Sequence, residues 1–290
     1  MTFGLRLLRV PATVLALGAL FAVIAPLAMT SYQPFTLAPG IGPATRITGP
    51  GPFGTVVEFV PTIETQYDAP LGEVIAQATV RSLALLAGVA VFSLCVGVLV
   101  GVSAALLRRR ALASGAILGA TSVVAAVPSF FLAYFLQILF IFIGGAAGHS
   151  VLPVFGYGLD SHLALPLLAL SAPAVATTAQ LTAVRMGEVF DADFITTAYA
   201  KGLLPSWIIK VHVLPHVLPV SLEAVGSGLR VAVASLPIVE YILLWNGIGF
   251  VALQSIALRD PAALTACAIV LGSLFALTSL LLDLRPARFH

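Results

Sequence analysis

Two histidines, His212 and His216, have the spacing of a pair of metal ligands on one face of a helix. Pro215 lies between them and no third ligand stands nearby in the sequence, so a metal site is not predicted. The sequence also lacks the HExxH, GxSxG and GxxxxGK(S/T) motifs of metalloproteases, serine hydrolases and phosphate-binding loops. We therefore predict no catalytic residue, no metal and no cofactor.

Polar side chains interrupt the long apolar runs at four positions, which are Gln137, Gln180, Arg230 and Glu240. Ionisable groups at membrane depth are costly and usually face a bundle interior or a water-filled path. We therefore predict that these residues line a polar pathway, to which Glu223 could contribute from two turns before Arg230. Two alternatives remain open. The glutamines could form hydrogen bonds between helices, and Glu223 could extend toward the membrane surface.

The elements that position these residues are predicted to be membrane helices. The chain has 290 residues, of which 60% are hydrophobic and only 9% are charged, and its mean hydropathy is +1.08. Soluble domains carry about 25% charged residues, so this is a membrane protein, and an all-α bundle is predicted because no short alternating segments suggest a barrel. The net charge of +2 gives no basis for nucleic-acid binding. Cys95 and Cys267 lie inside apolar runs and are predicted to be packing residues with free thiols.

Apolar runs divide the chain into three parts. Residues 1–30 contain a run of the ~20 residues that a spanning helix needs. We interpret it as an uncleaved first transmembrane helix, with a cleaved signal peptide as the alternative. Residues 31–78 are rich in proline and glycine and are predicted to form an extracytoplasmic loop, with short strands near 55–60. Residues 79–290 form the core, with five spans expected at 79–107, 114–144 (kinked at Pro128), 163–186, 219–245 and 262–282.

Three consecutive arginines, Arg108 to Arg110, end one expected span and mark the cytoplasmic side of the membrane. With about six spans in total, most lysines and arginines fall on this same side, together with both termini. The polar segment 191–215, between the fourth and fifth spans, is then also predicted to be cytoplasmic.

This polar segment has the pattern of a short capped helix followed by a second helix. Asp191 and Asp193 supply carboxylates at the positive end of the first helix. Lys201 lies in its last turn, and Gly202 follows where a left-handed residue is wanted. Pro205 suits the first turn of the second helix.

Apolar residues are expected on one face of the first of these helices. Phe194 and Ala198 are four residues apart, as are Ile195 and Tyr199, and this spacing places side chains on the same face. A short capped helix with an apolar face, set between two spans, is typical of a docking element for a partner. The alternative interpretation is an ordinary solvated loop.

Three motifs in the core follow known patterns. The stretch Asp193–Gly202 is similar to Asp-Tyr-Val-x-Thr-Ala-Arg-Ala-Lys-Gly, and Leu214-Pro215 follows at the matching spacing. Glu240–Gly249 resembles Glu-Thr-Val-Phe-Ser-Trp-Pro-Gly-Leu-Gly, and Arg259–Pro261 resembles Arg-Asp-Tyr-Pro. From about Thr79 to its C-terminus, the chain thus resembles the permease subunits of bacterial ABC importers of the dipeptide/oligopeptide/nickel group.

The resemblance implies the type I ABC importer permease fold, with a cytoplasmic coupling helix, in the lipid of the bacterial inner membrane. It implies three partners: a second permease, with this chain as the B-type member of a heterodimer, a cytoplasmic ABC ATPase, and an extracytoplasmic solute-binding protein. The chain itself has no phosphate-binding loop, so ATP hydrolysis is expected on the ATPase. The residues expected to couple to the ATPase are Asp193, Phe194, Ile195, Thr197, Ala198, Tyr199, Ala200, Lys201, Gly202, Leu214 and Pro215.

Two departures from the family pattern concern Tyr199, which stands for an arginine, and Asn246, which stands for a proline. The resemblance implies import of peptides or similar small solutes without fixing which one. An ion-gradient-driven secondary transporter is the alternative, but such a protein is expected to have acids in mid-span and inverted repeats. The mid-span acids are few and no convincing repeat is visible. A membrane-anchored enzyme or scaffold is a third possibility, for which the sequence offers no catalytic set.

Overall fold

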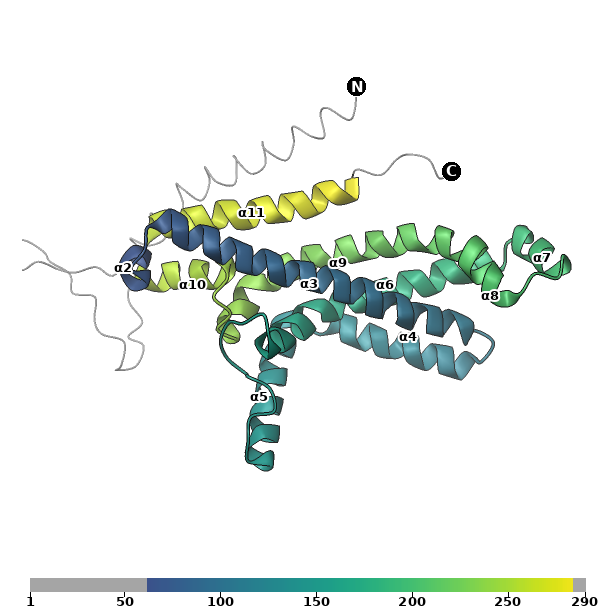
Figure 1. Cartoon of the computed structure of the whole chain (residues 1–290), viewed down its shortest axis with the longest axis horizontal. Helices are drawn as coiled ribbons and strands as arrows, with labels where there is room; N and C mark the ends of the chain where they lie inside the picture. The colour runs from purple at the N-terminus through teal and green to yellow at the C-terminus, as the bar shows by residue number, and fades with distance from the viewer. Residues whose placement is uncertain (1–61, 284–290) are drawn as a thin grey trace, which may run out of the picture. The chain divides into compact units, whose positions relative to one another are not determined.

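The computed structural model describes residues 62–283, and every regular element in that range is a helix (Figure 1). The expected first transmembrane helix and the expected strands near residues 55–60 lie outside the described residues. In chain order the elements are α2 (Ile63–Tyr67), α3 (Leu71–Leu106), α4 (Ala111–Ala126), α5 (Ser129–Ala147), η1 (Ser161–Leu163), α6 (Ala164–Phe190), α7 (Asp193–Ala200), α8 (Pro205–Ile208), η2 (Ile209–Val213), α9 (Leu214–Ile242), α10 (Ile248–Leu258) and α11 (Pro261–Asp283).

Within residues 62–283, five helical stretches are long and apolar enough to cross a membrane. They are Leu71–Leu106, Ser129–Ala147, Ser161–Phe190, Pro205–Ile242 and Pro261–Ser279. Two shorter apolar helices, α4 and α10, accompany them. The predicted fold class is confirmed, and the chain is an all-α, multi-pass membrane protein.

The kink expected at Pro128 within the span 114–144 is instead a break between two helices. α4 ends at Ala126 and α5 begins at Ser129. Proline has no backbone N–H and disfavours helical dihedrals in the residue before it. Val127 accordingly adopts an extended conformation, with φ −81° and ψ 122°. Two helices therefore replace one, and α5 runs at a steep angle to α4 (Figure 1).

The helix that follows the expected outer loop begins earlier than Thr79, since α3 starts at Leu71. The short helix α2 precedes it. Thr62 caps α2 by accepting a hydrogen bond from the N–H of Thr65, while the Thr65 hydroxyl accepts one from the N–H of Thr62. The last part of the segment 31–78 is thus helical.

The chain forms two compact units. Unit one comprises Met1–Ser82 and Asn246–Ser273, and unit two comprises Leu83–Trp245 and Leu274–His290. In unit two, α6 and α9 pack against each other along much of their lengths, and α4 and α5 both contact α6 (Figure 1). This pair of long helices therefore forms the centre of unit two.

Glycines allow the helices of unit two to approach closely. A Cβ atom on Gly101 of α3 would lie 2.5 Å from the carbonyl oxygen of Ala179 on α6, and Gly97 is similarly crowded one turn earlier. A Cβ atom on Gly228 of α9 would collide with Ala174 of α6. Helices in lipid associate through such close packing, because lipid tails are as apolar as the side chains themselves.

Unit one is held together by side chains that accept hydrogen bonds from helix N-termini. Asp260 accepts bonds from the backbone N–H groups of Ile63 in α2 (3.2 Å) and Ala263 in α11 (3.0 Å). The Ser82 hydroxyl oxygen accepts one from the N–H of Ile248, the first residue of α10 (2.9 Å). The first N–H groups of a helix have no partner within it, so these contacts satisfy groups that would otherwise be unpaired.

Candidate functional site

The short helix expected in segment 191–215 is present as α7. It is followed by Gly202, whose φ of +72° is the left-handed conformation that glycine adopts without strain. The N–H of Leu203 donates to the carbonyl oxygen of Ala198 (3.3 Å) and closes this end of the helix. Pro205 then begins α8, and the π-helix η2 joins α8 to α9. These local predictions are confirmed.

The role expected for Asp191 at the start of this helix is wrong. The N-cap of α7 is Ala192, which makes no side-chain capping bond, and Asp191 is the C-cap of the preceding helix α6. Asp193 does lie in the first turn of α7, where its carboxylate suits the positive end of the helix dipole. The carboxylate of Asp191 is instead engaged by an arginine.

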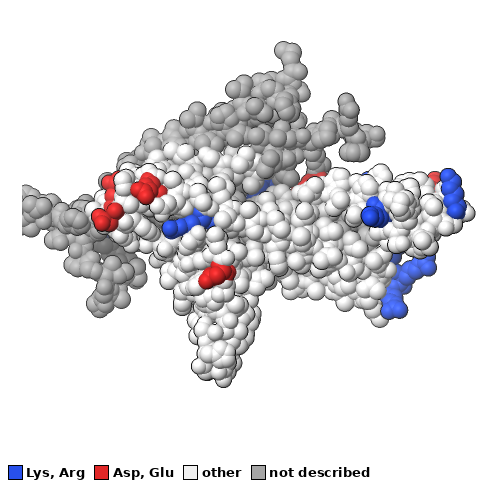
Figure 2. Space-filling view, in the orientation of Figure 1, with Lys and Arg blue, Asp and Glu red and all other residues white. Residues whose placement is uncertain are grey.

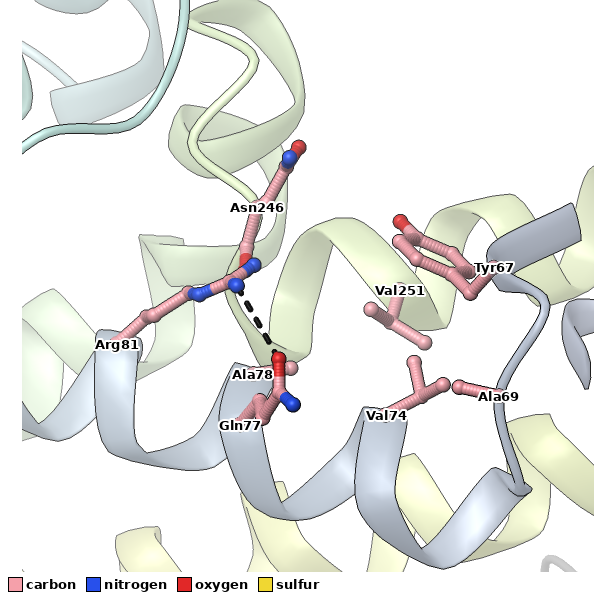
Figure 3. A pocket seen from close by; sticks show the side chains of 8 residues that line it. All are labelled: Tyr67, Ala69, Val74, Gln77, Ala78, Arg81, Asn246 and Val251. Carbon is pink, nitrogen blue, oxygen red and sulfur yellow. Dashed lines mark hydrogen bonds between the residues drawn. The ribbon is translucent and has the colours of Figure 1, made fainter.

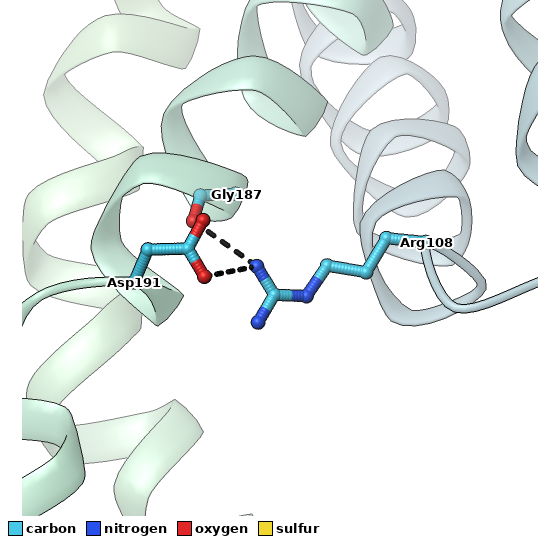
Figure 4. A network of polar contacts seen from close by, with 3 residues as sticks. All are labelled: Arg108, Gly187 and Asp191. Atoms are coloured by element: carbon cyan, nitrogen blue, oxygen red, sulfur yellow. Dashed lines mark hydrogen bonds and ion pairs between the residues drawn. The ribbon is translucent and has the colours of Figure 1, made fainter. Parts of the chain in front are cut away.

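That arginine is Arg108, in the turn between α3 and α4 (Figure 4). Its Nη1 donates to Oδ1 of Asp191 at 2.8 Å and to the carbonyl oxygen of Gly187 at 3.3 Å. Its guanidinium carbon also lies 5.1 Å from the ring centroid of Phe190, within cation–π range. Arg108 therefore ties the end of α3 to the end of α6, directly before α7 begins.

The inner face of α7 is buried against the ends of the long helices of unit two. Ile195 and Ala198 are 1% and 5% exposed. They belong to one apolar cluster with residues of α3, α6, α8, η2 and α9, namely Ala105, Met186, Val189, Ile208, Val213 and Val217. Because protein interiors are close-packed, a displacement of α7 would be transmitted to these helix ends.

The outer face of α7 and α8 is apolar but exposed. Phe194 and Tyr199 are 45% and 48% exposed, and Leu204 and Trp207 are exposed beside them. The Phe194 ring lies 5.6 Å from the ring of His216 on α9. We call Phe194, Tyr199, Leu204 and Trp207 the outer surface of the segment. Exposed apolar patches of this kind mark interaction sites.

The expectation that both i, i+4 pairs lie on a single apolar face is wrong. One member of each pair is buried and the other is exposed: Ala198 against Phe194, and Ile195 against Tyr199. The buried residues, Ile195 and Ala198, are three apart and share the inward stripe of the helix. α7 thus has two apolar faces, of which only one is covered by this chain's described residues.

Basic side chains surround the outer surface. Figure 2 shows lysine and arginine gathered at the end of unit two that carries α7, α8 and the α3–α4 turn. Lys201 follows α7, Lys210 lies in η2, and Arg109 and Arg110 are exposed in the turn. Arg185 on α6 pairs with Glu188 (2.9 Å). This end is suited to an acidic partner surface and to the headgroups of anionic lipids.

The polar residues expected to line a pathway have separate surroundings. Nε2 of Gln137 donates to the carbonyl oxygen of Ile242 (3.0 Å) at the end of α9. Nε2 of Gln180 donates to the hydroxyls of Thr121 (3.3 Å) and Ser122 (3.1 Å) on α4. For both glutamines, these bonds correspond to the alternative interpretation, that of helix–helix contacts.

The two charged candidates lie on α9. Glu240 is completely buried, whereas Arg230 is half-buried. Among residues 62–283, no group of three or more histidine, cysteine, aspartate or glutamate side chains could hold a metal ion. The feature that the sequence did not reveal is the contact of Arg108 with Asp191, although the run of three arginines had drawn attention to that position.

Comparison with known proteins identifies the class of this chain. Residues 97–286 match the family described as the binding-protein-dependent transport system inner membrane component. The chain belongs to this family of membrane transport components, and it is therefore a transport subunit, not an enzyme.

Individual relatives carry the names of peptide and glutathione permeases. The peptide transport system permease protein SapB of Salmonella typhimurium is 27% identical over 226 residues, which cover 68% of this chain and 69% of the relative. A peptide transport system permease of Brucella abortus is 30% identical over 224 residues (74% and 69%). The glutathione transport system permease protein GsiC of Salmonella choleraesuis is 26% identical over 222 residues (76% and 70%). A peptide permease of Brucella ovis is 29% identical over 126 residues, so the match spans 40% of its length.

Proposed function

We propose that this chain is one of two membrane subunits of an ATP-driven ABC importer for peptides or similar small solutes. Its family and the names of its relatives support this function. The observation that carries the proposal is the two-faced helix α7, which is packed into the bundle on one side and exposes aromatic rings on the other.

In this proposal the outer surface docks into a groove on a cytoplasmic ATPase. Closure of an ATPase pair around ATP would push on α7, and the buried pair Ile195 and Ala198 would pass the displacement to the ends of α3, α6 and α9. The bundle would then alternate between openings on the two sides of the membrane. We call residues 191–215 the docking segment; in it, Lys201 and Gly202 would shape the end of α7, and Leu214 and Pro215 the start of α9.

The arginine-rich turn supports a cytoplasmic position for residues 191–215 and for both chain termini, with the chain in the inner membrane of a bacterium. α4 and α5 would together make one crossing, since α4 is short and each of the other spans crosses once. The solute-binding protein would approach from the opposite side. The second permease, a different chain in a heterodimer, would cover part of the exposed aromatic side of α5, which carries Phe131, Phe135 and Phe142.

The translocation pathway is proposed to pass α9, with Arg230 and Glu240 as its polar residues. Both groups sit within a membrane-spanning helix, where an ionisable side chain is retained at a cost. Gln137 and Gln180 would support this pathway from outside, by fixing α5 to the end of α9 and α6 to α4.

The docking proposal is tested by copurification of the ATPase with the double variant Phe194→Ala/Tyr199→Ala. We expect the ATPase to be lost, because the two aromatic rings of the outer surface are removed while the buried face is unchanged. Phe155→Ala is the matched control, since Phe155 is 50% exposed in the loop after α5 and is predicted to lie on the other side of the membrane. Normal ATPase recovery with the double variant would rule out docking through α7.

A second variant tests coupling. Gly202→Leu places a side chain at a φ of +72°, a conformation that costs a non-glycine residue about 1–2 kcal/mol. The altered end of α7 should leave the protein in the membrane but reduce solute uptake per ATP hydrolysed in proteoliposomes. Gly187→Leu is the control, because nothing lies within 4 Å of a Cβ atom at that position.

A further inference from the structure

The joint between α6 and α7 consists of two residues, Asp191 and Ala192. Ala192 has an extended conformation, with φ −76° and ψ 145°, and makes no side-chain capping bond. The first N–H groups of α7 therefore receive no bond from an N-cap side chain, the contact that often fixes the start of a helix. An extended residue between two helices is a position where a hinge can absorb a change of angle. The joint itself thus contributes little to fixing α7 relative to α6.

Arg108, in the turn after α3, contacts three groups at the end of α6 (Figure 4). Its Nη1 donates to Oδ1 of Asp191 (2.8 Å) and to the carbonyl oxygen of Gly187 (3.3 Å), and its guanidinium carbon lies 5.1 Å from the ring centroid of Phe190. The C-terminal end of a helix carries partial negative charge and carbonyl groups without helical partners, so a cation is favourable there. One side chain therefore holds a carboxylate, a carbonyl and an aromatic ring of the same helix end.

These contacts use three properties of the guanidinium group: its N–H donors, its charge and its planar face. Lysine would keep the charge, and glutamine would keep an N–H donor, but neither combines all three properties. The side chains of Arg108 and Asp191 are 37% and 74% exposed, and ion pairs as exposed as this contribute little to stability. An effect of Arg108 on local geometry can therefore be separated by experiment from an effect on folding.

The same two helix ends form the surface on which α7 rests. Ala105 of α3 and Val189 of α6 belong to the apolar cluster that buries Ile195 and Ala198 of α7. Arg108 lies one turn after Ala105, and its contacts on α6 lie within two residues of Val189. Because the cluster is close-packed, a change in the separation of these helix ends would disturb the buried face of α7.

A second arginine joins distant segments in unit one. Arg81 donates from Nη1 to the backbone carbonyl oxygen of Asn246 (3.2 Å) and from Nη2 to Oε1 of Gln77 (3.4 Å). Figure 3 shows these residues at a pocket of about 150 Å³ that is lined by residues of α2, α3 and α10. Both of these bonds lie within unit one. Of the two arginines, Arg108 is therefore the one that contacts the start of the docking segment.

We propose that Arg108 is a positioning residue for coupling between the ATPase and the helix bundle. It holds the ends of α3 and α6 together, so that a push on α7 moves both helices as one body and does not bend the joint at Ala192. Without Arg108, part of each displacement of α7 bends the joint and less of it reaches the bundle. The inference rests on the proposed function, because it assigns a role in that coupling to a residue outside the outer surface.

The test measures ATP hydrolysis and uptake of radiolabelled trialanine in proteoliposomes that contain the chain with its second permease, ATPase and binding protein. Arg108→Gln should leave ATP hydrolysis and ATPase copurification unchanged. It should lower uptake per ATP hydrolysed by about two- to fivefold, the range for loss of one partly exposed ion pair. The trialanine concentration for half-maximal uptake should stay unchanged, because Arg108 lies outside the proposed pathway.

A second measurement does not depend on the solute. Hydrogen exchange at the backbone amides of Ile195 and Ala198 reports how firmly the inner face of α7 is held. In the purified complex, Arg108→Gln should accelerate exchange at these two amides by about the same two- to fivefold factor. Unchanged exchange would show that Arg108 does not fix α7.

Three further variants separate positioning from a general effect of charge. Arg108→Lys retains the charge and should restore part of the uptake per ATP. Asp191→Asn should lower this ratio, and combination with Arg108→Gln should lower it no further, because both changes remove the same ion pair. Arg109→Gln removes an exposed charge from the same turn. Whatever its effect on ATPase recovery, it should leave uptake per ATP at the wild-type value.

Unchanged uptake per ATP with Arg108→Gln, or an equal loss with Arg109→Gln, would overturn the positioning role. Loss of ATPase copurification with Arg108→Gln would also overturn it, because Arg108 would then be a docking residue. Additive losses in the double variant would rule out the pair with Asp191 as the cause. Failure of the import proposal is seen separately, as absence of ATP-dependent uptake by the wild-type complex, and the hydrogen exchange result does not depend on it.

Discussion

The segment with α7 and α8 in unit two and the helix junctions of unit one differ in which side chains they expose and which they bury. The segment with α7 and α8 turns aromatic and basic groups outward, and Phe194, Tyr199 and Trp207 are each about half exposed. Unit one turns polar groups inward, so that Asp260 and Ser82 bond to backbone groups of neighbouring segments. Exposed apolar area is typical of an interaction surface, whereas polar side chains bonded to helix N-termini hold neighbouring helices in place.

The largest expected effect comes from disturbing the packing of α6 against α9 at the centre of unit two. Gly228→Ala places a methyl group against Ala174, where α6 and α9 touch, and backbone must move to accommodate it. We expect a loss of about 3 kcal/mol or more in the free energy of unfolding, beyond the usual cost of overpacking. Thermal unfolding in detergent measures it. Gly115→Ala is the matched control, because a Cβ atom there meets nothing within 4 Å.

The next effect separates the two faces of α7. Ile195→Ala removes a buried side chain and should cost about 2–4 kcal/mol, whereas Phe194→Ala should cost less than about 1 kcal/mol, because its ring is half exposed. Denaturant titration of both variants tests this difference. Equal losses would mean that Phe194 is part of the core and not of a docking surface.

A smaller effect is expected in unit one from Asp260→Ala. The backbone N–H groups of Ile63 and Ala263 lose their acceptor, and leaving such groups unpaired costs about 1–3 kcal/mol. Hydrogen exchange at these two amides should accelerate. Glu73→Ala, an exposed carboxylate on the neighbouring helix, serves as the control. Unchanged exchange would show that the inward-facing polar contacts do not stabilise unit one.

The smallest effect concerns Arg108. Both Arg108 and Asp191 are partly exposed, so Arg108→Gln should cost less than about 1 kcal/mol, and the loss should vanish at high salt. Hydrogen exchange in the last turn of α6 measures it at low and high salt, with Arg109→Gln as the control. A large, salt-independent loss would place this pair in the core of the bundle.

Local chemistry made part of this structure predictable. Gly202 and Pro205 act through their own dihedral angles, so the end of α7 and the start of α8 followed from the sequence. The break at Pro128 is also a local effect, and the restriction that proline places on Val127 would have predicted a break where a kink was expected. The membrane class followed from composition alone.

The rest depends on residues that are distant in sequence. The sequence around Asp191 predicts a residue at the start of α7, but its carboxylate accepts a hydrogen bond from Arg108, which lies far away in the sequence. The periodicity of α7 gave two apolar pairs, but only the ends of α3, α6 and α9 determine which residue of each pair is buried. The hydrogen bond from Arg81 to the carbonyl oxygen of Asn246 joins residues that are 165 positions apart, and no local pattern in the sequence predicts it.

The π-helix η2 forms the junction between α8 and α9. Its hydrogen bonds reach the fifth residue, so its turn holds one residue more than an α-helical turn. Because the wide turn absorbs this extra residue, α8 and α9 keep nearly the helical phase of a continuous α-helix. Deletion of one residue from Ile209–Val213 would therefore let α8 run directly into α9 and would change little in the direction that Phe194 and Trp207 face.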